Sequence, residues 1–111
     1  IMDEAMQAYG MGDYSKAIKN LEQLPRTDTT LFFIGLAQVQ VAQDATEALK
    51  AVVDRPGSSF HNKALYHLML CAMGANNSAE AQRLWKEQLG AKDHPYEGRL
   101  EALASEAGWR P

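Results

Sequence analysis

The sequence predicts an all-α fold, in which three helical hairpins stack into an α–α solenoid and a C-terminal capping helix follows. Three segments carry this prediction. Each contains an apolar helical stretch, a break, a short polar start and a second helix with alanine near its beginning. The alanines that mark the second helices, Ala17, Ala48 and Ala81, lie 31 and 33 residues apart. A period in this range is typical of repeat arrays, whose units bury their apolar faces against one another.

Length and composition are consistent with one soluble globular domain over residues 1–111. The chain is 46% hydrophobic and 23% charged, and its net charge of −3 comes from interleaved acids and bases. Without a cluster of Lys and Arg, nucleic acid is not expected as a partner. The longest apolar run, residues 31–37, is far shorter than the roughly 18 to 20 residues of a membrane span, so this segment is not expected to insert into a membrane. Cys71 is the single cysteine, which excludes a disulfide within the chain.

The first hairpin is predicted over approximately residues 1–24. Its first helix has apolar residues at a spacing of three and four, namely Met2, Ala5, Met6 and Tyr9. Gly10 to Gly12 end that helix, and Asp13 is suited to cap the next one. Pro25 ends the second helix because proline lacks the backbone donor and clashes with the preceding turn.

The second and third hairpins are predicted over approximately residues 28–54 and 59–89. Thr27 or Asp28 caps the first of these helices, and residues 56–59 form a turn between the hairpins. Val39 and Val41 would also suit a strand, but the flanking Ala, Gln and Leu residues favour a helix. Residues 44–47 and 77–80 both read as capping boxes, each at the start of a second helix.

A capping helix is predicted over approximately residues 94–107. Pro95 suits its first turn, and Gly108 closes it. Before it, Leu89 is expected on the apolar face of the sixth helix, which Gly90 ends. Charged side chains give the capping helix the polar outer face that the end of a solenoid needs, and they are Glu97, Arg99, Glu101 and Glu106.

These residues resemble a tetratricopeptide repeat, whose unit of 34 residues favours glycine at the turn, an aromatic residue after it and alanine in the second helix. The third unit matches through Leu65, Leu68, Ala72, Asn76, Ala81 and Trp85. The first matches through Gly12, Asp13, Tyr14, Ala17 and Leu21, and the second through Phe32, Gly35, Ala48 and Val52. Two units are shorter than 34 residues, Gln43 stands where the turn glycine of unit two would be, and Met69 replaces a small residue in unit three.

The resemblance implies a right-handed solenoid without enzymatic activity or a cofactor, acting as a scaffold or adaptor. Such proteins bind a peptide or helix of a partner in a concave groove lined by the first helix of each hairpin. The matching positions are Met2, Met6, Tyr9, Phe33, Ala37, Gln40, Lys63, Tyr66, His67, Leu70 and Met73. Only Lys63 matches the lysines and asparagines with which one subclass holds a terminal carboxylate, so that role is disfavoured.

Two alternatives remain open. The domain could be a structural arm of a larger or homo-oligomeric assembly, with its groove filled by its own chain. It could also be an enzyme that uses Cys71 and His67, which lie four residues apart on one helix, as nucleophile and base. His61 and His67 fall on different helix faces, so no metal pair is expected.

The compartment is not fixed by the sequence. The start at Ile1 suggests a fragment of a longer protein. The short repeat array is similar to those of bacterial envelope or assembly proteins, which leaves the bacterial cytoplasm and the periplasm both open.

Overall fold

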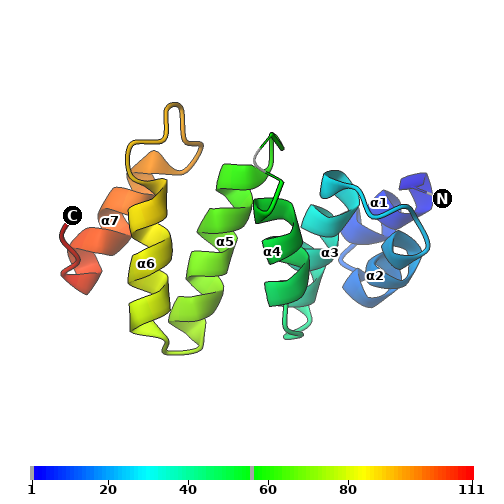
Figure 1. Cartoon of the computed structure of the whole chain (residues 1–111). Coiled ribbons are helices and arrows are strands. Elements are labelled where there is room, and N and C mark those ends of the chain that lie inside the picture. Colours follow the sequence, from blue (N-terminus) through cyan, green and yellow to red (C-terminus); the bar gives the residue numbers. More distant parts are fainter. Residues whose placement is uncertain (1, 56) are drawn as a thin grey trace.

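The computed structural model describes residues 2–55 and 57–111; Ile1 and Pro56, the latter in the predicted turn 56–59, lie outside the described residues. Within these ranges the protein contains seven helices and no strand, so the prediction of an all-α fold is confirmed (Figure 1). The helices are α1 (Met2–Gly10), α2 (Tyr14–Glu22), α3 (Asp28–Gln40), α4 (Thr46–Val53), α5 (His61–Gly74), α6 (Ser78–Gln88) and α7 (Glu97–Ala107).

The helices pack in the order of the chain. From α1 to α6 each helix contacts the next, and α3 also contacts α5. The molecule measures 44 × 28 × 21 Å and its radius of gyration is 14.5 Å, against about 13 Å for a compact domain of this length. Figure 1 accordingly shows an elongated row of helices with the two termini at opposite ends.

The turns inside the three hairpins are built alike. In each, one residue has a left-handed backbone, with φ of +81° at Gly12, +59° at Ala42 and +58° at Asn76. The N–H of the following residue then bonds to the carbonyl five positions back, in the pairs Asp13 to Ala8, Gln43 to Gln38 and Asn77 to Ala72. This is the Schellman geometry that satisfies the last carbonyls of a helix. In unit two the residue in the left-handed position is Ala42 rather than Gln43.

Helix α7 ends in the same way as the first helices of the hairpins. Gly108 has a φ of +75°, and the N–H of Trp109 bonds to the carbonyl of Ala104 at 2.9 Å. The predicted stop at Gly108 is therefore confirmed. The charged residues of α7 named above are all exposed.

Three of the predicted helix caps form and one does not. The side chains of Asp13, Thr27 and Asn77 accept bonds from the backbone three positions on. The predicted box at Asp44 is wrong, because α4 begins after Ala45 and the Asp44 carboxylate accepts from Thr46 N–H in a turn instead. In the second predicted box, the Glu80 carboxylate binds Arg83 rather than reaching back.

Two boundaries near the C-terminus also differ from the prediction. Helix α6 ends at Gln88, and Leu89 adopts an extended backbone with 44% of its surface exposed, so Leu89 is not on the apolar face. Pro95 lies before α7 and not in its first turn. The backbone N–H of Tyr96 is held by the ring of His94, which fixes residues 94–96 as a turn.

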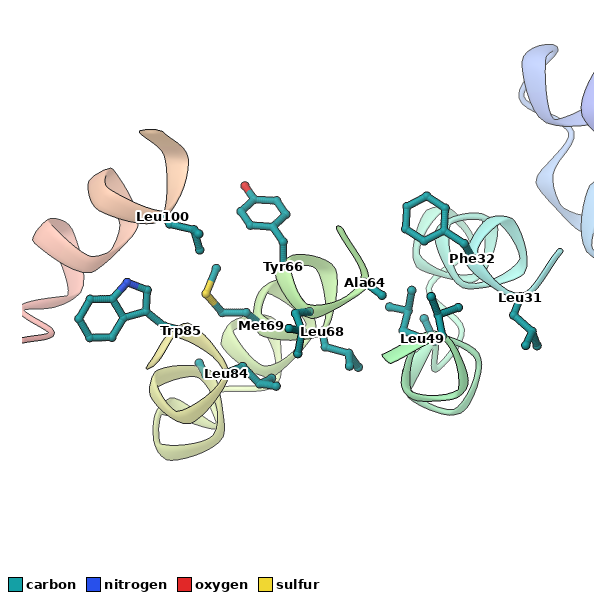
Figure 2. Packing of buried hydrophobic residues seen from close by; sticks show 14 of the residues in the cluster. Leu31, Phe32, Leu49, Ala64, Tyr66, Leu68, Met69, Leu84, Trp85 and Leu100 are labelled. Atoms are coloured by element: carbon teal, nitrogen blue, oxygen red, sulfur yellow. The ribbon is translucent and has the colours of Figure 1, made fainter. Parts of the chain in front are cut away.

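The core lies between successive helices rather than at one centre. A large cluster runs from α3 to α7 and includes Leu31, Leu49, Met69, Trp85 and Leu100 (Figure 2). A smaller one joins the first hairpin to α3 through Ala5, Leu21 and Ile34. Gly35 of α3 lies so close to the Leu49 side chain that a Cβ atom at Gly35 would come within 2.7 Å of it. This close approach explains the small residue in α3 at that position.

Candidate functional site

Aromatic rings form a continuous row along the first helices of the hairpins. Neighbouring rings in this aromatic row contact one another, with centroids 4.4 to 6.3 Å apart. The members, in order from the N-terminal end, are Tyr14, Tyr9, Phe33, Phe60, Phe32, His67, Tyr66 and Tyr96. The row thus links α1, α3, α5 and the turn before α7.

Most members of the aromatic row keep part of their surface open. Phe32 and Tyr66 are buried, with 4% and 5% of their surface exposed, and they anchor the row in the core. The other six are half-buried. Because ring edges and faces attract one another at these separations, the rings hold each other in place while one side remains accessible.

The residues predicted to line the groove do not all reach the surface. Tyr9, Phe33 and His67 are half-buried members of the row. Other candidates around it are half-buried as well, and these are Met2, Met6, Lys63, Leu70 and Met73; Gln40 is exposed. Ala37 and Tyr66, however, belong to the interior. The methyl group of Ala37 is completely covered, and the ring of Tyr96 lies 4.4 Å from that of Tyr66.

Sequence reasoning missed four members of the row. Phe32 was matched to the repeat pattern of unit two and not to its groove, and the other three are Tyr14, Phe60 and Tyr96. Tyr14 stands at the start of a second helix, and Phe60 and Tyr96 precede their helices. None of these three belongs to the apolar period of a first helix, so a search along that period does not find them. An aromatic residue just before a helix, at Phe60 and again at Tyr96, is the signal that could have pointed to them.

The C-terminal half of the row carries positive charge. The Lys63 ammonium lies 5.7 Å from the centroid of Phe60, and the Arg99 guanidinium lies 5.4 Å from that of Tyr96. Within residues 2–55 and 57–111, neither cation has a carboxylate at ion-pair distance. Burial lowers the pKa of His67, and the charge of Arg99 lowers it further. Both effects favour the neutral form of the His67 ring.

A cleft of about 910 Å³ opens between the second and third hairpins. It adjoins the row at His67, and its walls include apolar groups of α3 and α5 such as Val39, Leu70 and Cys71. Charged groups from α4 and α6, among them Lys50 and Arg83, also line it. The volume is within the range of ligand-binding pockets.

The surroundings of Cys71 disfavour a nucleophilic thiol. The side chain is half-buried, and burial together with the nearby charge of Asp44 raises the pKa of the thiol. The neighbouring base candidate, His67, has a pKa shifted downward. Since the thiolate is the reactive form, both shifts oppose an activated pair.

We expect the Cys71 thiol to react slowly in the native protein. At neutral pH its rate with an aromatic disulfide reagent should be about tenfold or more below that of free cysteine, because little thiolate is present. After unfolding in urea the rate should return to the free value. A native rate equal to or above that of free cysteine would restore the enzymatic alternative.

His94 is the centre of a buried polar network that joins α6 to α7. Its Nδ1 accepts from the Tyr96 N–H at 3.0 Å, so the opposite nitrogen, Nε2, carries the proton and donates to Gln88 Oε1 at 2.9 Å. The Gln88 amide in turn donates to the carbonyl of Leu84. Only 6% of His94 is exposed. This network positions Tyr96 at the end of the aromatic row.

Two features are absent from the described residues. Among them, no group of three or more His, Cys, Asp and Glu side chains is placed to hold a metal ion. None of the helices there is long and apolar enough to cross a membrane.

Comparison with known proteins yields no relative. The chain matches no family model, and no curated protein or solved structure matches it. Its function must therefore be inferred from the placement of its own side chains.

Proposed function

We propose that this chain is a tetratricopeptide-like repeat array that binds a segment of a partner protein along the aromatic row. The observation that carries the proposal is the row itself, because it is continuous over the first helix of every hairpin. A surface of this length suits an extended or helical segment better than a small molecule.

The three matching turns support the repeat architecture. The left-handed residues Gly12, Ala42 and Asn76 lie 30 and 34 positions apart, and Gly108 follows 32 positions later. Helix α7 therefore stands where the first helix of a fourth hairpin would be. In α3, the residue seven positions before the left-handed turn residue is Gly35, which packs against α4. The equivalent residue of α7 is Glu101, which is exposed. A charged residue there suits a helix that ends the array.

The chemistry of the row supports protein binding rather than catalysis. Half-buried aromatic rings are the side chains that most often dominate binding energy at protein interfaces. Three half-buried methionines of α1 and α5, Met2, Met6 and Met73, belong to a residue type that adapts its shape to a partner. The protonated Cys71 thiol, in contrast, gives no activated nucleophile.

The alternative function, a structural arm whose groove is filled by its own chain, is favoured at one end of the aromatic row only. Tyr96 covers Tyr66, so the C-terminal end of the row is already occupied by the chain itself. From Tyr9 to His67 the rings other than the buried Phe32 remain half-open. Sedimentation velocity over a wide concentration range separates the two functions. A monomer at all concentrations agrees with an open row, whereas strong self-association favours an oligomeric arm.

We expect removal of the Tyr9 and Phe33 rings to weaken partner binding without unfolding the protein. The double variant Tyr9→Ala/Phe33→Ala should weaken the affinity for a captured and purified partner at least tenfold, since interface anchors contribute about 2 kcal/mol or more. Partners are captured from the native host by cross-linking and identified by mass spectrometry. Binding is then measured by calorimetry with the purified partner.

Two further variants make this test specific. Phe33→Leu keeps most of the buried volume and removes only the ring, which separates a loss of binding from a loss of folding. Met11→Ala removes a side chain that is 78% exposed on the first turn, outside the row, and should bind normally. Unchanged affinity in the folded double variant would exclude the row as the site.

A further inference from the structure

Among residues 2–55 and 57–111, no carboxylate lies at ion-pair distance from the two cations of the aromatic row. Lys63 and Arg99 lie over the faces of Phe60 and Tyr96, so their positive charges are placed at the row. The described ion pairs of the chain join other residues, namely Arg26 with Glu47 and Arg83 with two glutamates of α6. Lys63 is half-buried and Arg99 is exposed. Because neither has a carboxylate of the described residues at ion-pair distance, an anionic group gains attraction at both.

The cations are also spaced along the row rather than gathered at one point. From Phe60 the ring contacts continue through Phe32 and His67 to Tyr96, with centroids 4.7, 6.0 and 6.0 Å apart. The two cations therefore lie at the opposite ends of a run of four rings. The arrangement fits a segment with several acidic side chains beside an apolar stripe.

The acids of α7 do not form an ion pair with Arg99 in the described residues. On α7, Glu106 lies two turns from Arg99 on the same face, about 10 Å along the axis. Glu97, two residues from Arg99, belongs to a different face of the helix. The charge of Arg99 also lowers the pKa of His67, which lies in the middle of the run.

We infer that the segment bound by the aromatic row is an acidic amphipathic helix of a partner protein, whose apolar residues pack on the half-buried rings and whose carboxylates bind Lys63 and Arg99. This inference rests on the proposed function and adds the chemistry of the partner. The net charge of the chain is −3, so overall electrostatics would favour a basic partner. A preference for an acidic one must therefore come from local cations, and Lys63 and Arg99 are the two that lie over rings of the row.

Two helical peptides of about 15 residues, long enough to form a helix, test this inference. Both carry Leu and Phe at helical spacing; the acidic probe has Glu and Gln at the other positions, and the basic probe has Lys and Gln. Their ends are acetylated and amidated, so that a terminal carboxylate is not the group recognised. We expect the acidic probe to bind at least tenfold more tightly, and this preference to shrink between about 0.05 and 0.5 M salt.

Matched variants identify the groups responsible. Lys63→Gln/Arg99→Gln should erase the preference, while Lys19→Gln/Arg110→Gln, which removes the same charge from exposed positions outside the row, should keep it. Equal binding of both probes, or a preference that survives the first double variant, would overturn the inference. If the wild type binds both probes equally and the Tyr9→Ala/Phe33→Ala variant binds neither, the proposed function stands and only the acidic character of the partner is rejected.

The remaining outcomes also decide between explanations. Binding of neither probe would count against the row and the acidic partner together. Self-association that disappears in Lys63→Gln/Arg99→Gln would assign the surface to a second copy of this chain and overturn the inference.

Discussion

Leu49→Ala should destabilise the protein by about 2 to 5 kcal/mol, the cost of removing a large side chain from a packed core. Leu49 of α4 is completely buried and fills the space against Gly35 of α3, where no Cβ atom is present to take its place. The surrounding helices cannot close the cavity without separating α3 from the next hairpin. Urea denaturation followed by circular dichroism measures the change as a lower midpoint with an unchanged slope.

Leu89→Ala is the matched control because it makes the same substitution at a leucine that is 44% exposed. Its cost should stay within about 0.5 kcal/mol, as for most surface changes. If the two variants lose equal stability, the central packing of α3 on α4 is not as described.

Acidic pH should lower the free energy of unfolding through protonation of His94. Burial lowers the pKa of His94 in the folded protein, although the charge of Glu97 acts in the opposite direction. Between the folded pKa and the unfolded value of about 6.5, the unfolded chain binds more protons than the folded one. The stabilising contribution is therefore complete above pH 6.5 and is lost as the pH falls toward the folded pKa. Protonation at Nδ1 also removes the acceptor for the Tyr96 N–H.

His94→Ala separates this contribution from that of other groups. At pH 7.5 it should cost about 1 to 3 kcal/mol, because Gln88 Oε1 is left buried without its donor. Between pH 7.5 and 5.5 its unfolding free energy should fall less steeply than that of the wild type. His67, whose pKa is also lowered, contributes in the same direction and is removed in a parallel His67→Ala variant. Equal slopes in wild type and His94→Ala would contradict the role of the network.

The sequence predicts the helices because local rules determine them. Apolar residues at helical spacing place all seven, and Asp13, Thr27 and Asn77 cap three of them as expected. The errors lie where tertiary contacts override local preference. At α4 the buried Ala45 takes the cap position in place of Asp44, and before α7 the buried His94 holds Pro95 outside the helix.

The candidate site was less accessible to sequence reasoning than the fold. Spacing along a first helix identified Tyr9, Phe33 and His67, which belong to the row. It also selected Tyr66, because nothing local shows that the ring of Tyr96, thirty residues later in the chain, covers it. The placement of Lys63 and Arg99 over rings likewise depends on loops whose shape only the folded chain defines.

The most direct test of the proposed binding surface is a two-dimensional NMR titration of the labelled chain with the acidic probe. We expect perturbed amides to gather on α1, α3, α5 and residues 96–99, while the outward positions Lys19 and Lys86 of α2 and α6 remain unchanged. Perturbations concentrated on α2, α4 and α6, or the absence of any, would contradict partner binding along the aromatic row.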